Sequence, residues 1–144
     1  MLNCQIITSK EDLKACYEIR TKVFIEEQNV SSEIEMDDLD SIASHFLIYS
    51  DKIPVATGRL VKTNDNMGKI GRIAVLKEYR GQNIGYFLMN KIINYAKEQN
   101  LSILPISAQS HALAFYEKFG FKAYGEEFLE ANIPHYMMRL DFGD

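Results

Sequence analysis

The sequence predicts a single α/β (α+β) domain over residues 1–144, built from a mixed sheet flanked by helices. Segments with the alternating apolar pattern of strands take turns along the chain with segments that have apolar residues at helical spacing. No internal repeat, low-complexity tract or linker divides them, and a chain of this length buries roughly two thirds of its unfolded surface in one domain. A hydrophobic content of 47% and a charged content of 25% are typical of a soluble globular protein.

The first part of the chain is predicted to contain a strand, a helix and a hairpin. Residues 4–9 (CQIITS) have the composition of a strand, and Ser9 with Asp12 resembles the capping box of a helix start. Apolar residues then recur at helical spacing to about residue 27, and an acidic loop follows. A hairpin is expected to turn near Asp51–Lys52, between strands at 44–51 and 53–63.

The second part alternates strands and helices to the end of the chain. Residues 68–76 are apolar on both alternating sets, which is typical of a central strand. A strand at 102–108 precedes a short helix over 111–120 that Gly120 closes. Between these two strands a long helix is expected, with a buried stripe of Ile84, Phe87, Leu88, Ile92, Tyr95 and Ala96. The last two strands are expected at 121–125 and 135–141.

Charge and cysteine content exclude several classes of protein. The formal net charge of −4 argues against nucleic-acid binding, which needs a dense basic face. No apolar run approaches the roughly 18 residues of a membrane span, and the N-terminus lacks a signal-peptide pattern, so no membrane association is expected. Cys4 and Cys16 have no metal-ligand spacing and are expected to be core residues, which fits a cytoplasmic protein without a metal site.

The turn before the long helix is chemically unusual. The first N–H groups of a helix lack intrahelical partners and lie at the positive end of its dipole, yet residues 79–85 offer no short acidic or hydroxyl cap. Gly81 and Gly85 allow close approach of a ligand, Asn83 tolerates left-handed φ, and Arg80 supplies donors for phosphate oxygens. These residues favour a pyrophosphate site, although an ordinary helix-start turn has a similar composition. The P-loop and dinucleotide-binding fingerprints are both absent.

Two stretches together resemble the acetyl-CoA-binding half of the GNAT acetyltransferase superfamily. The first, RIAVLKEYRGQNIGYFLMNKIINYAKEQ, matches the R/Q-x-x-G-x-G/A signature with residues 80–85. The second, AQSHALAFYEKFGF, carries the F-Y pair before G-F, here Phe115, Tyr116, Gly120 and Phe121. RTKVFIEEQNV and NIPHYMMRLD further resemble the small bacterial ElaA-like branch, so the resemblance covers nearly the whole chain. Two positions depart from the pattern: Asn83 replaces the middle glycine, and Gln109 stands where Asn is frequent.

The resemblance implies a mixed, mostly antiparallel sheet of about six to seven strands, splayed between the fourth and fifth strands to admit the pantetheine arm of acetyl-CoA. Pro105 cannot donate to a sheet ladder and fits a place where pairing has been lost. Exposed backbone groups of Ile73, Ala74 and Val75 are expected to pair with pantetheine, and one of them to polarise the thioester carbonyl. The other expected cofactor contacts are Arg80, Gly81, Gln82, Asn83, Ile84, Gly85, Gln109 and Tyr116.

The chemistry implied is acetyl transfer to an amine. A primary amine with a pKa near 10 is mostly protonated at neutral pH, so it must lose a proton, and the departing thiolate must gain one. By resemblance Tyr116 is the acid, although an F-Y pair also suits core packing. His111 is the candidate base because a helix start disfavours its charged form, although such a histidine can equally be an ordinary surface residue.

The acceptor amine is expected to meet acidic residues and histidines. Five carboxylates crowd Glu33 to Asp40, and either they form a solvated loop or some of them, or Glu26 or Glu27, attract a cationic amine. His45 and His135 each begin a predicted strand and are either structural or part of the acceptor pocket. The candidate substrate contacts are Glu27, Glu33, Asp37, His45 and His135.

Three functions remain open from the sequence. The leading one is an acetyl-CoA-dependent N-acetyltransferase acting on a small-molecule or otherwise exposed primary amine. The second is a non-catalytic acyl-CoA-binding module, and the third is a regulatory domain that binds another nucleotide or phosphate at the same helix start. The acceptor and the oligomeric state, including a homodimer, are also open.

Overall fold

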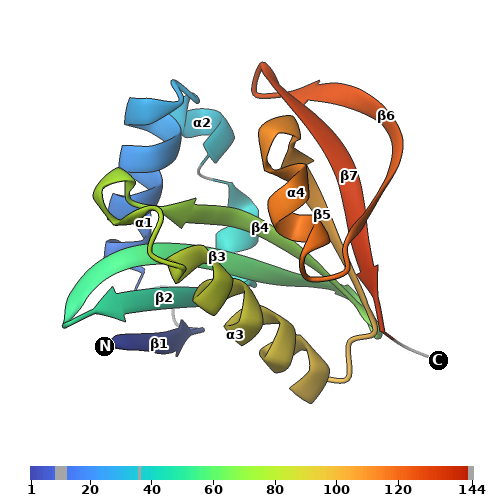
Figure 1. The fold of residues 1–144 in the computed structure, drawn as a ribbon, viewed down its shortest axis with the longest axis horizontal. Helices are drawn as coiled ribbons and strands as arrows, with labels where there is room; N and C mark the ends of the chain where they lie inside the picture. The colour runs from blue at the N-terminus through green and yellow to red at the C-terminus, as the bar shows by residue number, and fades with distance from the viewer. Residues whose placement is uncertain (9–12, 36, 143–144) are drawn as a thin grey trace.

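The computed structural model describes residues 1–8, 13–35 and 37–142, without the side chains of residues 33 and 34, and shows a seven-stranded mixed sheet covered by helices (Figure 1). The strand order is β1-β2-β3-β4-β5-β7-β6, and β4–β5 is the parallel pair. The strands are β1 Leu2–Ile7, β2 Ser44–Ser50, β3 Ile53–Asn64, β4 Met67–Val75, β5 Ile103–Gln109, β6 Lys122–Glu130 and β7 Ile133–Asp141. The helices are α1 Lys14–Arg20, η2 Thr21–Glu27, α2 Ser32–Glu35, η3 Asp38–Ser41, η4 Lys77–Tyr79, α3 Ile84–Glu98, η5 Ser110–Ala112 and α4 Leu113–Glu117. The predicted fold class is confirmed.

Several element bounds differ from the prediction for identifiable reasons. The helix to residue 27 runs as α1 and then as the π-helix η2, and the capping box at 9–12 lies outside the described residues. The acidic stretch predicted as a loop contains α2 and η3, because the Asp37 side chain accepts from the Leu39 amide and caps η3. Strand β6 continues past residue 125, where the predicted strand ended, because Gly125 takes φ +76° in a bulge.

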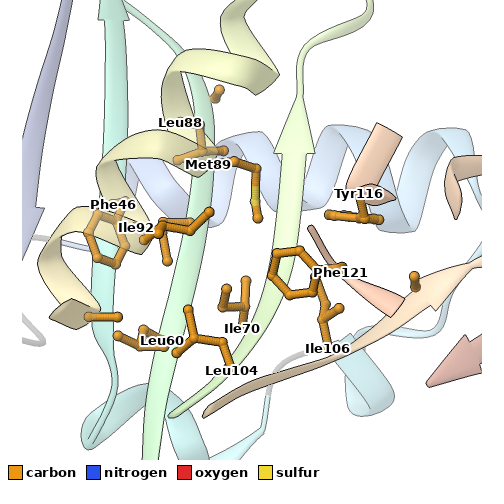
Figure 2. Close-up of a cluster of buried hydrophobic side chains, with 14 of the residues drawn as sticks. Phe46, Leu60, Ile70, Leu88, Met89, Ile92, Leu104, Ile106, Tyr116 and Phe121 are labelled. Carbon is orange, nitrogen blue, oxygen red and sulfur yellow. The ribbon is translucent and has the colours of Figure 1, made fainter. Parts of the chain in front are cut away.

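Two hydrophobic clusters cover opposite faces of the sheet. Helices α3 and α4 pack on one face with Phe46, Leu104 and Phe121 (Figure 2), and α1 packs on the other with Leu47. Neighbouring residues of β2 therefore point to opposite buried faces, as expected for a strand inside a three-layer domain. No helix in the described ranges is long and apolar enough to cross a membrane.

Strands β4 and β5 separate toward their carboxyl ends. Their pairing comprises Met67 with Ile103 and Ile70 with Ile106, although the strands continue to Val75 and Gln109. A register shift in β4 next to Arg72, which takes φ +54°, bends this strand where the separation begins. The predicted splay is present. Pro105 instead lies just before Ile106, at the end of the paired stretch rather than in the separated part.

Candidate functional site

The turn from β4 to α3 presents free backbone donors. Asn83 is the N-cap of α3 in the left-handed conformation, with φ +63°, and its side chain makes no capping hydrogen bond. The first helical bond is from the Phe87 amide to the Asn83 carbonyl at 3.1 Å. Among the described residues, the N–H groups from Gly81 to Tyr86 have no acceptor, and no acidic residue lies in the first turn. This helix start can therefore bind an anion.

The two glycines of this turn have different roles. Gly81 has φ +81°, and a Cβ built there has no heavy atom within 4 Å, so the backbone at Gly81 is open. A Cβ on Gly85 would lie 3.2 Å from Cζ of Phe115 in α4. Gly85 therefore allows close packing of α3 on α4, and its expected contact with a ligand stays a prediction. Ile84 is a buried core residue, and the side chain of Gln82 is exposed.

The Arg80 side chain contacts a carboxylate from the other side of the sheet. Its Nη1 and Nη2 donate to the two Glu27 oxygens at 2.7 and 2.8 Å, and its Nε donates to the Val75 carbonyl at 3.0 Å. The hydrogen bond from Arg80 lowers the pKa of Glu27 below its usual value. Glu27 was expected to contact the acceptor amine, and Arg80 was expected to contact the phosphates of the cofactor. In the structure the two side chains bind each other.

The last residues of β4 leave one strand edge unpaired. Ala74 and Val75 pair with Thr57 and Ala56 of β3. On the opposite edge no strand of the described residues pairs with β4 beyond Ile70. Ile73, Ala74 and Val75 therefore line the opening between β4 and β5, where no strand pairs with them, while the Val75 carbonyl accepts from Arg80 Nε.

Tyr116 lies in α4 beside this opening with a buried ring. The residue is 7% exposed, and its ring packs edge-on against Phe115 and Phe121 at centroid distances of 5.1 and 6.0 Å. Burial raises the pKa of the Tyr116 phenol well above its usual value. The hydroxyl has no hydrogen bond among the described residues, whereas every fully buried polar side-chain atom there has one. The hydroxyl therefore reaches accessible space.

A chain of hydrogen bonds connects the end of η2 with the end of β5. Gln109 Nε2 donates to Gln28 Oε1 at 3.0 Å, and the exposed His111 contacts Gln109 Oε1 through Nε2 at 2.7 Å. An amide oxygen only accepts, so His111 donates from Nε2. Gln109, expected to contact the cofactor, thus closes one side of the opening. Gln28 was missed from the sequence, although it belongs to the RTKVFIEEQNV motif.

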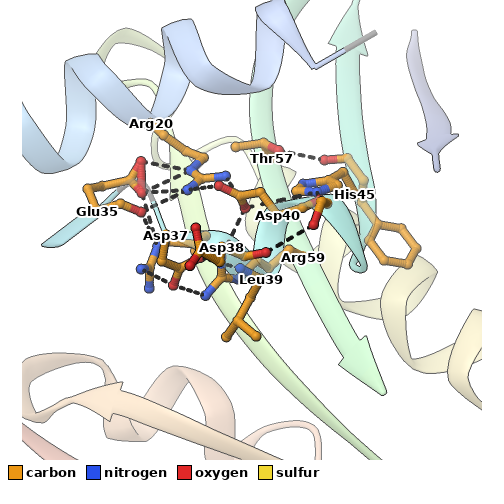
Figure 3. Close-up of polar contacts among 12 residues, drawn as sticks. Arg20, Glu35, Asp37, Asp38, Leu39, Asp40, His45, Thr57 and Arg59 are labelled. Atoms are coloured by element: carbon orange, nitrogen blue, oxygen red, sulfur yellow. Dashed lines mark hydrogen bonds and ion pairs between the residues drawn. The ribbon is translucent and has the colours of Figure 1, made fainter. Parts of the chain in front are cut away.

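The acidic segment after η2 forms a buried ionic cluster, made of Arg20, Arg59, Arg72, Glu35, Asp37 and Asp40 (Figure 3). Arg20 is 1% exposed and donates to Glu35 at 2.7 Å and to Asp40 at 2.9 Å. Arg59 joins Asp40 to Asp37, and Arg72 joins Asp37 to Glu35. The three arginines balance Glu35, Asp37 and Asp40, so these carboxylates are paired, whereas Asp38 is exposed and forms no ion pair among the described residues.

Electrostatics within this cluster favour the charged carboxylates. Burial alone raises the pKa of Asp40, but hydrogen bonds from Arg20 and Arg59 bring it below its usual value. Hydrogen bonds from Arg59 likewise lower the pKa of Asp37. Asp37, expected to contact the substrate, is thereby held by Arg59 and Arg72. The Glu33 side chain lies outside what the structure describes.

Histidines 45 and 135 have different surroundings. His45 is 1% exposed, its Nε2 contacts the Asp40 carbonyl at 2.9 Å, and burial lowers its pKa. His45 therefore supports the ionic cluster from within the core, through its contact with Asp40. His135 lies at the carboxyl end of β5, directly opposite Gln109 in the sheet, and its ring stacks on Phe128.

Comparisons with known proteins agree with this geometry. Residues 8–142 match the family model of the acetyltransferase (GNAT) domain. The chain is 37% identical over 137 residues to the uncharacterized N-acetyltransferase YjcF of Bacillus subtilis, covering 94% of this chain and 97% of that protein.

Two solved structures are similar over almost their full length. Escherichia coli ElaA superposes with a TM-score of 0.86 at 28% identity, covering 96% of this chain and 99% of ElaA. An acyl-CoA N-acyltransferase from Pseudomonas aeruginosa superposes with a TM-score of 0.86 at 30% identity, again with 96% and 99% coverage.

Proposed function

Because this chain belongs to the GNAT acetyltransferase family, and thus to the acyl-CoA-dependent N-acyltransferases, we propose that it transfers an acetyl group from acetyl-CoA to a primary amine. The amine belongs to a small molecule or an exposed amino group and attacks directly, with both substrates bound. The observation that carries this proposal is the row of unpaired amides from Gly81 to Tyr86 beside the opening between β4 and β5.

The donors at this place suit the parts of coenzyme A. The amides at the start of α3 are directed to a pyrophosphate, with open space at Gly81. The unpaired edge of β4 at Ile73, Ala74 and Val75 suits the amide groups of pantetheine. Arg80 joins the phosphate contacts once it exchanges Glu27 for a phosphate oxygen, since both are bidentate partners of a guanidinium.

Acetyl-CoA, when bound, supplies an acyl carbon activated as a thioester. The protein's own part is to move protons and to orient the two substrates. A tyrosine phenol, with an ordinary pKa of about 10, is protonated at neutral pH, and burial raises the pKa of Tyr116 further, so its Oη holds a proton that it can give to a departing thiolate. A backbone N–H from the free edge of β4 polarises the carbonyl that is attacked.

The other two functions predict different ligand behaviour. A non-catalytic acyl-CoA-binding module needs the amides and the strand edge but not an accessible phenol such as that of Tyr116. A regulatory domain for another phosphate ligand needs the amides alone and leaves the unpaired edge of β4 without a use. The unpaired edge of β4 therefore argues against the regulatory domain, and the accessible phenol of Tyr116 favours the enzyme over the binding module.

Acetyl-CoA is expected to raise the melting temperature of the protein by several degrees, because a ligand at 100 times its Kd stabilises the native state by about 2.7 kcal/mol. Melting curves with and without acetyl-CoA test this, with ATP at the same concentration as the control. No increase with acetyl-CoA, or an equal increase with ATP, contradicts the proposal. Thiol release with a panel of amines then tests transfer.

Replacing Glu27 by glutamine is expected to tighten acetyl-CoA binding about two- to fivefold, because it removes a carboxylate that competes for Arg80 and such half-exposed pairs contribute about 1 kcal/mol or less. Isothermal titration measures this. Glu78→Gln is the matched control, since Glu78 acts on Arg80 through its charge without a hydrogen bond. An equal gain in both variants would point to general charge alone, and weaker binding in Glu27→Gln would mean that Glu27 orients Arg80.

A further inference from the structure

Near the carboxyl end of β5, a histidine and a carboxylate lie with their polar atoms facing each other. His135 is opposite Gln109, so both side chains lie on the same face of the sheet, the face that carries the end of η2 through Gln28. The same end of β5 leads through η5 into α4, which holds Tyr116. Figure 1 shows the β6–β7 turn and α2 at this end of the molecule.

The protonation pattern of neutral His135 follows from its contacts. Its Nδ1 is 2.6 Å from the Ile133 carbonyl, which only accepts, so Nδ1 carries the hydrogen and Nε2 carries the lone pair. The His135 side chain is 7% exposed. No hydrogen bond of its Nε2 occurs among the described residues, although the rest of the ring is fixed by Ile133 and Phe128.

Glu130, which the sequence did not single out, faces this nitrogen. Its Oε1 accepts from Ser107 Oγ at 3.1 Å, and its Oε2 lies 3.7 Å from His135 Nε2. Both facing atoms are acceptors, and their separation is too long for a hydrogen bond. No arginine or lysine of the described residues pairs with Glu130, in contrast to Glu35, Asp37 and Asp40. No positively charged donor of the described residues contacts both Glu130 and His135.

Resting on the proposed function, we propose that Glu130 and His135 bind the ammonium group of the acceptor and that His135 Nε2 is the base that deprotonates it. A primary ammonium has several N–H donors and can reach both acceptors at once. Its proton passes to Nε2, the amine nitrogen forms the C–N bond, and the C–S bond breaks. The thiolate takes the proton of Tyr116 Oη, and the second proton of the attacking nitrogen passes to the resulting phenolate, which leaves a neutral amide and a neutral phenol. The Glu130 carboxylate stabilises the imidazolium that results. The acceptor is therefore a cationic primary amine.

The first test needs no turnover. The chain contains three histidines, so side-chain ¹⁵N NMR with histidine variants assigns each ring. Above neutral pH, His135 is expected with its hydrogen on Nδ1. Spermidine is expected to shift the Nε2 signal in the wild type and not in Glu130→Gln. A hydrogen on Nε2, or the same shift in Glu130→Gln, overturns the proposal.

The second test uses turnover with the best acceptor among lysine, glucosamine, spermidine and a short peptide with a free N-terminus. Glu130→Gln keeps the acceptor for Ser107 but loses the charge, and is expected to raise KM for the amine about tenfold and to lower kcat several-fold, because the imidazolium loses its carboxylate partner. His135→Asn keeps a donor near Ile133 but loses Nε2, and is expected to lower kcat about 100-fold. Glu127→Gln is the matched control, because Glu127 lies in the same strand and contacts Ser110.

Each outcome of the second test is decisive. Equal effects in Glu127→Gln and Glu130→Gln, or loss of activity in His111→Gln but not in His135→Asn, overturn the proposal. Melting temperatures close to that of the wild type exclude unfolding, and Glu130→Gln alone suffices if His135→Asn does not fold. If the wild type neither binds acetyl-CoA nor releases thiol, the proposed function fails, and the NMR test still judges the pair by itself.

Discussion

Replacing Arg20 by methionine is expected to lower the free energy of unfolding by about 3–5 kcal/mol and the melting temperature by on the order of 10 °C. Arg20 is 1% exposed and satisfies oxygens of both Glu35 and Asp40. Without it these buried carboxylates face each other with too few positive partners, and removal of one member of a buried ion pair costs more than the pair gains. Thermal and urea denaturation measure the loss.

Arg139→Met is the matched control for this change. Arg139 also pairs with an aspartate at 2.7 Å, but both side chains are 48% exposed, so its loss is expected to stay within about 0.5 kcal/mol. If Arg20→Met is as stable as Arg139→Met, the buried cluster does not hold the segment after η2. A gain in stability would instead mean that burying these charges costs more than their pairing returns.

Replacing Tyr116 by phenylalanine is expected to lower kcat by about 100-fold or more while acetyl-CoA binding is retained. The change removes the hydroxyl, which has no hydrogen bond among the described residues, and leaves the ring that packs on Phe115 and Phe121. Stability should therefore change little. Thiol release measures turnover, and the acetyl-CoA-dependent shift of the melting temperature measures binding.

Tyr124→Phe serves as the control, because Tyr124 is a half-exposed tyrosine of β6. Unchanged turnover in Tyr116→Phe would leave Tyr116 as a core aromatic and move the role of the acid elsewhere. Loss of acetyl-CoA binding together with turnover would place the hydroxyl in cofactor binding rather than in proton transfer.

The fold was largely predictable because its signals are local. The strand pattern of 68–76 places β4 at the centre of the sheet, and the turn at Asp51–Lys52 has positive φ at both residues. The errors arose where tertiary contacts override composition. Gly125 marks a bulge within a long strand rather than a strand end, and the acidic stretch folds because arginines from β3 and β4 neutralise it.

The candidate site was predictable only in part, because its side chains meet across long separations in the sequence. The helix start at Asn83 follows from the missing cap, which is a local feature. The partners of that site do not: Glu27 and Arg80 are 53 positions apart, and Gln28 and Gln109 are 81 apart. Glu130 carried no signal, since it lay in a stretch read as a connection between two short strands.

The packing at Gly85 affects how α3 is placed relative to Tyr116. Gly85 lies in the same helix as the free amides, and Phe115, which fills the space of its missing side chain, is the immediate neighbour of Tyr116. Because Gly85 has no side chain, α3 packs closely on α4 through Phe115, and this contact helps to set the distance between the amides at the start of α3 and the Tyr116 phenol. A methyl group at this position would lie 3.2 Å from Cζ of Phe115, so that ring would have to shift, and the shift would reach the residue next to Tyr116.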